Sequence, residues 1–351
     1  MKTRAATLVA PALGLSACSL VAGLGPEKSL APDASAIADA AASDANADAG
    51  AAETGSGAVF AGCRIFPADN AWNRDVSEDP VDTDAMATIF PNMAAETGLH
   101  PDWGTIEQGY GIPINVGQAP PTPLKLTGPA ASQSDIVACP NDAGGNCYGI
   151  SVGARIEAAS DAHLIVLDTT GAPGDCTLYE MVGAADDAGA WSASNGAVFH
   201  LGSNALRPDG WTSADPAGLP ILAGLVRYDE ARDGEIRHAL RFTMRNVYLG
   251  YIHPATHSIG TRTQGLPPMG LRLRLKKTFD VSGFTGAALP VLRAMQKYGI
   301  ILADRGSDWY VTGETSDGWA SQTDDVAKQL GRVHGADFEI VKSGPVSTAG
   351  L

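Results

Sequence analysis

The hexapeptide Leu271-Arg272-Leu273-Arg274-Leu275-Lys276 alternates leucine with a basic residue at every position. Successive side chains of a β-strand point to opposite faces, so the three leucines share one face and the three cations share the other. The alternation therefore predicts a strand with one apolar and one basic face. We expect the basic face either to be solvated, as on most half-exposed antiparallel strands, or to form the floor of a groove for an acidic polymer.

Further strand patterns surround this hexapeptide and indicate the fold class. Alternating or β-branched runs occur at residues 112–116, 154–158, 163–169, 177–182, 197–201, 225–228, 236–244 and 247–252. Turn-forming residues separate these runs, as hairpins require. Helical periodicity is convincing only at 286–298 and 323–333, with short strand patterns at 300–303, 309–312 and 338–341. We therefore expect a mainly β protein with one globular body at 59–351. In it, a β-sandwich or jelly-roll-like domain at 59–282 carries a small α+β element at 283–342.

The 351-residue chain is strongly acidic, with 24 basic and 39 acidic side chains and a formal net charge of −15. Nucleic acids and anionic membrane surfaces are bound through clustered lysine and arginine, so neither is expected as the main partner. Apolar residues make up 44% of the chain, which is enough for a core. After residue 25, no apolar run is long enough to span a bilayer.

The N-terminus has the pattern of an export signal. Lys2 and Arg4 precede an apolar stretch that ends in Leu15-Ser16-Ala17-Cys18. This ending resembles a bacterial lipobox, in which the cysteine becomes lipidated; an ordinary secretory signal is the alternative. We expect residues 1–18 to be a signal peptide and a lipid on Cys18 to attach the chain to a membrane without crossing it.

The residues after Cys18 suggest where the anchor is held. By resemblance to lipoprotein sorting, a serine at Ser19 in place of aspartate favours the outer membrane. Residues 31–52 contain 12 alanines and scattered aspartates but almost no large apolar side chains. We expect 19–58 to be a flexible acidic tether, with a marginal surface helix as the alternative.

Four cysteines remain once Cys18 is assigned to the anchor, and an even number in an exported chain predicts disulfides. Cys139 and Cys147 enclose a loop of turn-forming residues, so we expect them to pair, which leaves Cys63 for Cys176. A four-cysteine metal site is the alternative, but the chain has no Cys-x-x-Cys spacing.

The densest group of polar and aromatic residues follows residue 203. It comprises Asp209, Trp211 and Asp215 in the connection 204–220, followed by Arg227, Asp229 and Glu230. Long connections between strands commonly carry binding and catalytic residues. Carboxylates beside a tryptophan suit sugar chemistry, because the indole stacks on a pyranose ring while one carboxyl acts as acid and another as base. The alternative is that Asp209 and Asp215 are turn and cap residues.

Residues 235–242 show a second alternation. His238 shares one predicted face with Ile236, Leu240 and Phe242, and Arg241 lies on the other. A histidine in an apolar row is commonly a core residue bonded to backbone. His238 is nevertheless the best general-base candidate if that face lines a pocket.

No motif specifies a metal or a cofactor. His253 and His257 are four residues apart, which suits a shared metal only on a helix, and no glutamate follows the first histidine. Asp304 and Asp308 precede Trp309, which we include among the substrate-binding candidates; a calcium-binding turn is the alternative interpretation. The sequence has no phosphate-binding loop, dinucleotide fingerprint or serine hydrolase elbow, so no cofactor is expected.

Four motifs mark the body of the chain as one unit. They are Ile65-Phe66-Pro67-Ala68-Asp69-Asn70-Ala71-Trp72-Asn73, residues 207–230, residues 267–272 and residues 298–309. In these motifs the chain resembles a group of exported bacterial proteins. The resemblance covers nearly everything after Cys63 and implies one body carried behind an export signal, but it implies no particular activity.

Two hypotheses about function follow. The first is an envelope-anchored carbohydrate-active enzyme, a glycoside hydrolase or polysaccharide lyase, acting on an extracellular polysaccharide. In it Asp215, Asp229 or Glu230 would supply acid and base, His238 would be the alternative base, Trp211 would stack on the sugar, and Arg227 or Arg241 would hold an acidic group. The second is a non-catalytic cell-surface lipoprotein that binds a glycan or a protein through the same aromatic loops.

Overall fold

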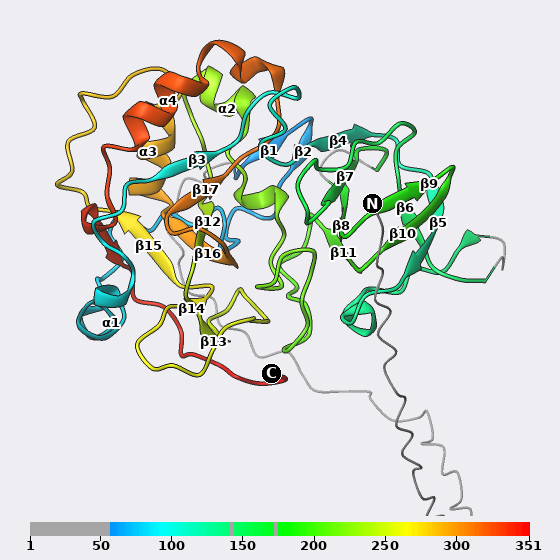
Figure 1. Cartoon of the computed structure of the whole chain (residues 1–351), viewed down its shortest axis with the longest axis horizontal. Helices are drawn as coiled ribbons and strands as arrows, with labels where there is room; N and C mark the ends of the chain where they lie inside the picture. The colour runs from blue at the N-terminus through cyan, green and yellow to red at the C-terminus, as the bar shows by residue number, and fades with distance from the viewer. Residues whose placement is uncertain (1–56, 141–143, 172–174) are drawn as a thin grey trace, which may run out of the picture. The chain divides into compact units, whose positions relative to one another are not determined.

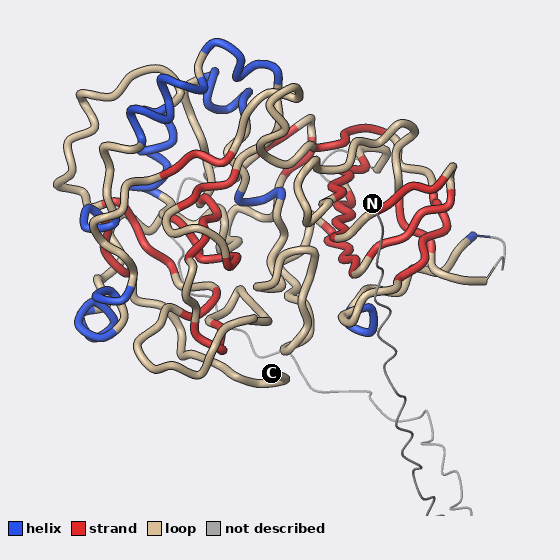
Figure 2. The backbone as a smooth tube through the Cα atoms, viewed as in Figure 1, coloured by secondary structure: helices blue, strands red, loops and turns tan. Residues whose placement is uncertain are grey.

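The computed structural model describes residues 57–140, 144–171 and 175–351. The expected signal peptide, Cys18 and almost all of the expected tether lie outside these residues. The described part belongs to one compact unit and is mainly β (Figure 1, Figure 2). It contains eighteen strands and four α-helices. The expected fold class is therefore confirmed.

A six-stranded sheet with the order β18-β15-β16-β12-β17-β3 carries most of the polar residues discussed below. Its strands are, in that order, Phe338–Ile340, Arg272–Leu275, Ile300–Arg305, Leu240–Met244, Tyr310–Thr312 and His100–Asp102. Three of these strands come from residues 283–342. The expected C-terminal α+β element therefore does not sit apart from the β domain but completes this sheet.

One face of the six-stranded sheet is apolar. Cross-strand pairs on this face are Leu240–Ile300, Phe242–Leu302 and Phe242–Val311, and all of these residues are buried. The ring of Phe242 also stacks on that of Trp309, with centroids 5.7 Å apart. Helix α3 (Ala288–Lys297) packs on β15, and α4 (Thr323–Leu330) packs on β3. Burial of this apolar surface is the main stabilising contribution to the fold.

The hexapeptide at 271–276 forms β15, but its basic face is neither solvated nor the floor of a groove. Arg272 and Arg274 are only 5% and 7% exposed. Their guanidinium groups donate to the carbonyl oxygens of Ala71, Val76, Asp79 and Tyr298 and to the carboxylate of Glu339. The expectation was wrong because residues 71–79 lie against this face and supply three of the five acceptors that the two buried cations use.

A β-bulge in β16 determines where Asp304 points. Phe242 of β12 pairs with Leu302, but the next residue, Thr243, pairs with Asp304, so Ala303 is an extra residue in β16. One extra residue moves the following side chains to the opposite face of a sheet. Without the bulge Asp304 would point to the apolar face with Leu302; with it, Asp304 shares the polar face with Thr243.

Two four-stranded sheets form the sandwich-like part of the molecule. Their orders are β11-β8-β7-β4 and β6-β5-β10-β9. The first contains Asn195–His200, Thr177–Val182, Leu164–Asp168 and Ile114–Gly117, and the second contains Cys147–Gly149, Pro121–Leu126, Ala190–Ala193 and Ala185–Asp187, each in sheet order. Leu164 and Val166 of one sheet share a buried cluster with Leu124 and Tyr148 of the other. The opposite face of β7, with Ile165 and Leu167, belongs to the main core.

The remaining elements are short. They are the paired strands β1 (Val59–Phe60) and β2 (Cys63–Arg64), the paired strands β13 (Tyr248–Tyr251) and β14 (Pro268–Met269), and helices α1 (Thr83–Thr88) and α2 (Tyr228–Asp233). Two expected strands are wrong: residues 154–158 form no strand, and 225–228 lead from a 3-10 turn into α2. Among the described residues, none of the helices has the length and apolar character needed to cross a membrane.

Both expected disulfides are present, joining Cys63 to Cys176 and Cys139 to Cys147. All four cysteines of the body are therefore paired, which excludes the four-cysteine metal site. Two disulfides in one chain indicate an oxidising, extracellular environment.

The two disulfides should differ in their contribution to stability. Cys63 and Cys176 are 113 residues apart, whereas Cys139 and Cys147 are 8 apart. Because a longer closed loop restricts the unfolded chain more, the double change Cys63→Ala/Cys176→Ala should lower the free energy of unfolding by about 5 kcal/mol and Cys139→Ala/Cys147→Ala by about 2.5 kcal/mol. Urea unfolding of both variants measures this difference. A larger loss in the second variant would contradict the chain-entropy explanation.

Candidate functional site

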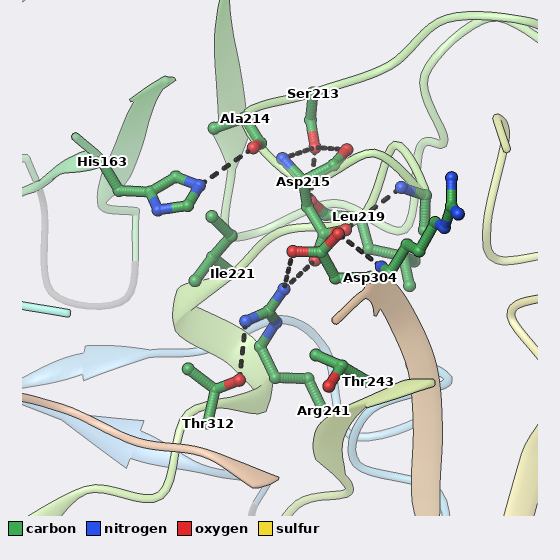
Figure 3. A network of polar contacts seen from close by, with 12 residues as sticks. His163, Ser213, Ala214, Asp215, Leu219, Ile221, Arg241, Thr243, Asp304 and Thr312 are labelled. Atoms are coloured by element: carbon green, nitrogen blue, oxygen red, sulfur yellow. Dashed lines mark hydrogen bonds and ion pairs between the residues drawn. The ribbon is translucent and has the colours of Figure 1, made fainter. Parts of the chain in front are cut away.

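Arg241 lies at the centre of a polar network on the second face of the six-stranded sheet (Figure 3). Its side chain is 3% exposed. Its Nη1 donates to Oγ1 of Thr312 over 2.9 Å, and its Nη2 donates to Oδ2 of Asp215 over 3.0 Å. Oδ2 of Asp304 lies 3.7 Å from the same Nη2. Two carboxyl groups therefore share one buried guanidinium group.

Asp215 is held in place by the connection that carries it. The residue is fully buried, and its Oδ1 accepts a hydrogen bond from the backbone N–H of Ala217 over 3.1 Å. Its own backbone N–H donates to Oγ of Ser213, which donates to the carbonyl oxygen of Leu219 over 2.6 Å. Asp215 is thus a turn residue, which was the alternative to a catalytic role in the sequence analysis. It is also the ionic partner of Arg241. Complete burial keeps it out of contact with a substrate.

Asp304 is the member of the network that solvent reaches, with 22% of its side chain exposed. Burial and the negative charge of Asp215 raise the pKa of Asp304 to about 7, against the opposing charge of Arg241. Burial also raises the pKa of Asp215, but Asp215 has the shorter contact with Arg241, 3.0 Å against 3.7 Å, whereas each carboxyl accepts one backbone N–H, from Ala217 and from Arg305. Asp215 therefore carries the negative charge of this pair, and Asp304 retains a proton near neutral pH.

His163 and Glu157 form a second ion pair beside this one. Nδ1 of His163 lies 2.6 Å from Oε2 of Glu157, and its Nε2 lies 3.3 Å from the carbonyl oxygen of Ala214, next to Asp215 (Figure 3). Burial lowers the pKa of His163, but its hydrogen bond to Glu157 and the charge of Glu157 outweigh burial and raise it. Both ring nitrogens face acceptor oxygens, an arrangement that favours the protonated imidazole.

The polar face continues to the edge of the sheet through β17 and β3. Thr312 is opposite Asp102, and Tyr310 is opposite His100. The rings of His100 and Tyr310 are stacked, with centroids 4.1 Å apart and planes 12° apart. His100 is exposed, and Tyr310 and Asp102 are half-buried. Burial raises the pKa of Asp102, against the opposing charges of Arg241 and His100. The face therefore passes from a buried ion pair to an accessible edge.

Four of the expected site residues lie together in a different network. Glu230, in α2, bridges Nη2 of Arg227 over 2.8 Å and Nε2 of His238 over 3.0 Å. Burial alone would raise the pKa of Glu230, but the charges of Arg227 and His238 lower it to about 2. Oδ1 of Asp229 accepts the backbone N–H of Glu230. A carboxylate with so low a pKa is a poor proton donor, so this network is better suited to fixing α2 than to acid catalysis.

His238 itself is a core residue in the structure. It is fully buried, and its Nδ1 lies 2.8 Å from the carbonyl oxygen of Ala239, so both ring nitrogens have acceptor partners. The apolar residues around His238 in the sequence had suggested this role, a core histidine bonded to backbone, as one of two interpretations. The general-base role is not supported, because neither nitrogen is available to a substrate.

The remaining candidates lie in three other places. Asp209 is exposed and pairs with Nε2 of His253 over 2.8 Å. Trp211 is half-buried, with the guanidinium carbon of Arg207 5.8 Å from its ring centre. Trp309 is fully buried in the main core, where its Nε1 donates to the carbonyl oxygen of Met93. The expectation that Trp309 binds substrate was therefore wrong.

Neither metal alternative is supported. His253 pairs with Asp209, while Nδ1 of His257 lies 2.7 Å from the carbonyl oxygen of Pro216. Asp304 belongs to the Arg241 network, whereas Oδ1 of Asp308 accepts the backbone N–H of Arg245. Within the part of the chain that the structure describes, no group of three or more His, Cys, Asp or Glu residues is placed to hold a metal ion.

The network around Arg241 joins two residues that the sequence singled out, Arg241 and Asp215, with residues whose roles it missed. Asp304 was noted only in an acidic turn, and His163 only at the start of a predicted strand. The alternation of side chains along β12 predicts the position of Arg241, since it places Arg241 on the face opposite to that of the apolar residues Leu240 and Phe242. The bulge that turns Asp304 toward Arg241 has no comparable signal in the sequence.

Comparison of the chain with protein-family models, with curated proteins and with solved structures found no match.

Removal of the central cation should destabilise the fold in a pH-dependent way. Arg241→Gln leaves Asp215 buried without its ionic partner, which should lower the free energy of unfolding by about 3–5 kcal/mol at pH 8. The pKa values of Asp215 and Asp304 are raised, so both carboxyls bind protons more tightly in the folded state than in the unfolded state. The free-energy cost of keeping them ionised in the folded protein therefore grows as pH rises. The loss should therefore be smaller at pH 5.

Chemical unfolding at the two pH values measures this effect. Arg232→Gln is a suitable control, because Arg232 forms an exposed pair with Asp233 and its removal should change stability little at either pH. Equal losses at pH 5 and pH 8 for Arg241→Gln would show that the carboxyls do not depend on this cation.

Proposed function

We propose that the protein is an exported, envelope-anchored carbohydrate-active enzyme, a glycoside hydrolase or polysaccharide lyase, and that the Arg241 network is its active site. The observation that carries this proposal is the state of Asp304: a partly exposed carboxyl whose pKa is raised to about 7. Cleavage of a glycosidic bond requires a group that keeps its proton near neutral pH and gives it to the leaving oxygen.

In this proposal each member of the network has a distinct role. Asp304 is the general acid. Asp215 and Arg241 are positioning residues, because Asp215 raises the pKa of Asp304 and Arg241 keeps Asp215 ionised in the core. Asp102, half-buried on the same face, is the second carboxyl of the site. The proposed acid and base are thus Asp304 and Asp102, in place of the expected Asp215, Asp229 and Glu230.

The proposal predicts that Asp304→Asn abolishes turnover without unfolding the protein. The amide cannot donate a proton to the glycosidic oxygen, so kcat should fall by about 10²–10⁴. For the unmodified protein kcat should decline above pH 7, as Asp304 loses its proton. Release of reducing ends and of unsaturated uronates from a panel of neutral and acidic polysaccharides measures turnover.

Asp233→Asn is the matched control, since Asp233 is exposed on α2 and belongs to neither network. Full activity in Asp304→Asn with normal folding would refute the role of Asp304. Binding of a polysaccharide without any product would instead favour the second function, a non-catalytic glycan-binding lipoprotein.

The envelope location is part of the same proposal and rests on the lipobox-like residues before Cys18 and on the two disulfides. We expect the unmodified chain to fractionate with membranes, at the outer membrane of a Gram-negative host. Cys18→Ser removes the thiol that would carry the lipid and should release the protein into the soluble fraction. Membrane retention of Cys18→Ser at the level of the unmodified chain would contradict lipid anchoring.

A further inference from the structure

The stacked rings of His100 and Tyr310 occupy the accessible end of the polar face described above. They come from neighbouring parallel strands at one edge of the six-stranded sheet. The centroid distance of 4.1 Å and the interplanar angle of 12° make them one rigid aromatic unit. His100 is exposed and Tyr310 is half-buried, so part of the unit remains open to solvent. An aromatic surface beside carboxyl groups is a common arrangement for binding a sugar ring.

Polar groups surround this aromatic unit along the same rows of the sheet. Asp102 lies two residues beyond His100, so both side chains point to one face. On the next strand Tyr310 is opposite Thr243, and Thr243 is opposite Asp304. The aromatic unit and the proposed acid therefore lie in a single cross-strand row. Thr243 in this row is buried and donates to the carbonyl oxygen of Ser307, whereas the partly exposed carboxyls of Asp102 and Asp304 offer hydrogen-bonding groups for sugar hydroxyls.

The charges of this face favour an uncharged ligand. The two cations of the network are already paired, Arg241 with Asp215 and His163 with Glu157. Within the part of this face that the structure describes, a uronate would therefore have to give up its water without a buried cation left to pair with it, and an unpaired charge is costly to remove from water.

We infer that the His100–Tyr310 stack is a sugar-binding subsite and that the substrate chain carries uncharged sugar rings. This inference rests on the proposed function and narrows it. Removal of a proton beside a uronate carboxyl is then not the reaction, because the ring has no such carboxyl. Hydrolysis remains: the glycosidic bond breaks, Asp304 gives its proton to the leaving oxygen, water supplies the new hydroxyl at the anomeric carbon, and the other proton of that water passes to Asp102.

The experiment separates binding from turnover. Affinity electrophoresis through gels that contain soluble glucan, mannan, xylan or a polyuronate measures binding by the full chain, by Asp304→Asn and by Tyr310→Ala. Tyr310→Phe keeps the ring and is the matched control, and His100→Ala removes the exposed half of the stack. Thermal unfolding of each variant establishes that it is folded.

We expect one neutral polymer to retard the unmodified protein and Asp304→Asn equally. Tyr310→Ala and His100→Ala should weaken that binding about fivefold to tenfold, and Tyr310→Phe should not. Folded Tyr310→Ala that binds as tightly as the unmodified chain would overturn the subsite while leaving Asp304 and the proposed function intact. Tighter binding of the polyuronate would overturn the uncharged substrate. Neither binding nor cleavage of any polymer would overturn both proposals.

Discussion

The ion pair between Arg241 and Asp215 is the constraint on which the polar face depends. Both side chains are almost completely buried, and neither charge can remain in the core without the other. The pair joins β12 to the connection that follows β11, which brings elements from two sheets to one place. It also leaves a negative charge close to Asp304, so the same contact that holds the structure together keeps a partly exposed carboxyl protonated near neutral pH.

A second buried carboxylate holds the same connection farther along the chain. Glu180, on β8, is fully buried, and its two oxygens accept the backbone N–H groups of Ile221 and Leu222 over 2.8 Å each. Burial raises its pKa to about 7. Residues 215–222 are thus fixed at one end by a guanidinium from the six-stranded sheet and at the other by a carboxylate from the sandwich. This arrangement explains how residues 212–222, which contain no strand, can be almost as buried as the core.

The sequence predicts those features that depend on local pattern. The strand at 177–182, both disulfides and the burial of His238 follow from alternation, from turn-rich spacing and from an apolar row. The exposure of β15 was mispredicted, because whether a basic face is solvated depends on residues 71–79, which lie far away in the sequence. The role of Asp304 depends on the single extra residue at Ala303, and a bulge of this kind is set by pairing between strands rather than by local composition. The candidate site therefore emerged only in part from the sequence.

The disulfide between Cys63 and Cys176 has a mechanical consequence. It links the short strand β2 directly to the residue before β8, a central strand of its sheet. A pulling force applied to the N-terminal side of the chain therefore reaches the body at Cys63 by two routes. One is the backbone that continues after Cys63, and the other is the disulfide, which transmits part of the force directly to β8 of the sandwich. The weak pairing of β1 with β2 does not have to bear this load alone. A body pulled from its N-terminal side would therefore resist shear through the pairing of β8 with two neighbouring strands, rather than through the two residue pairs that join β1 to β2.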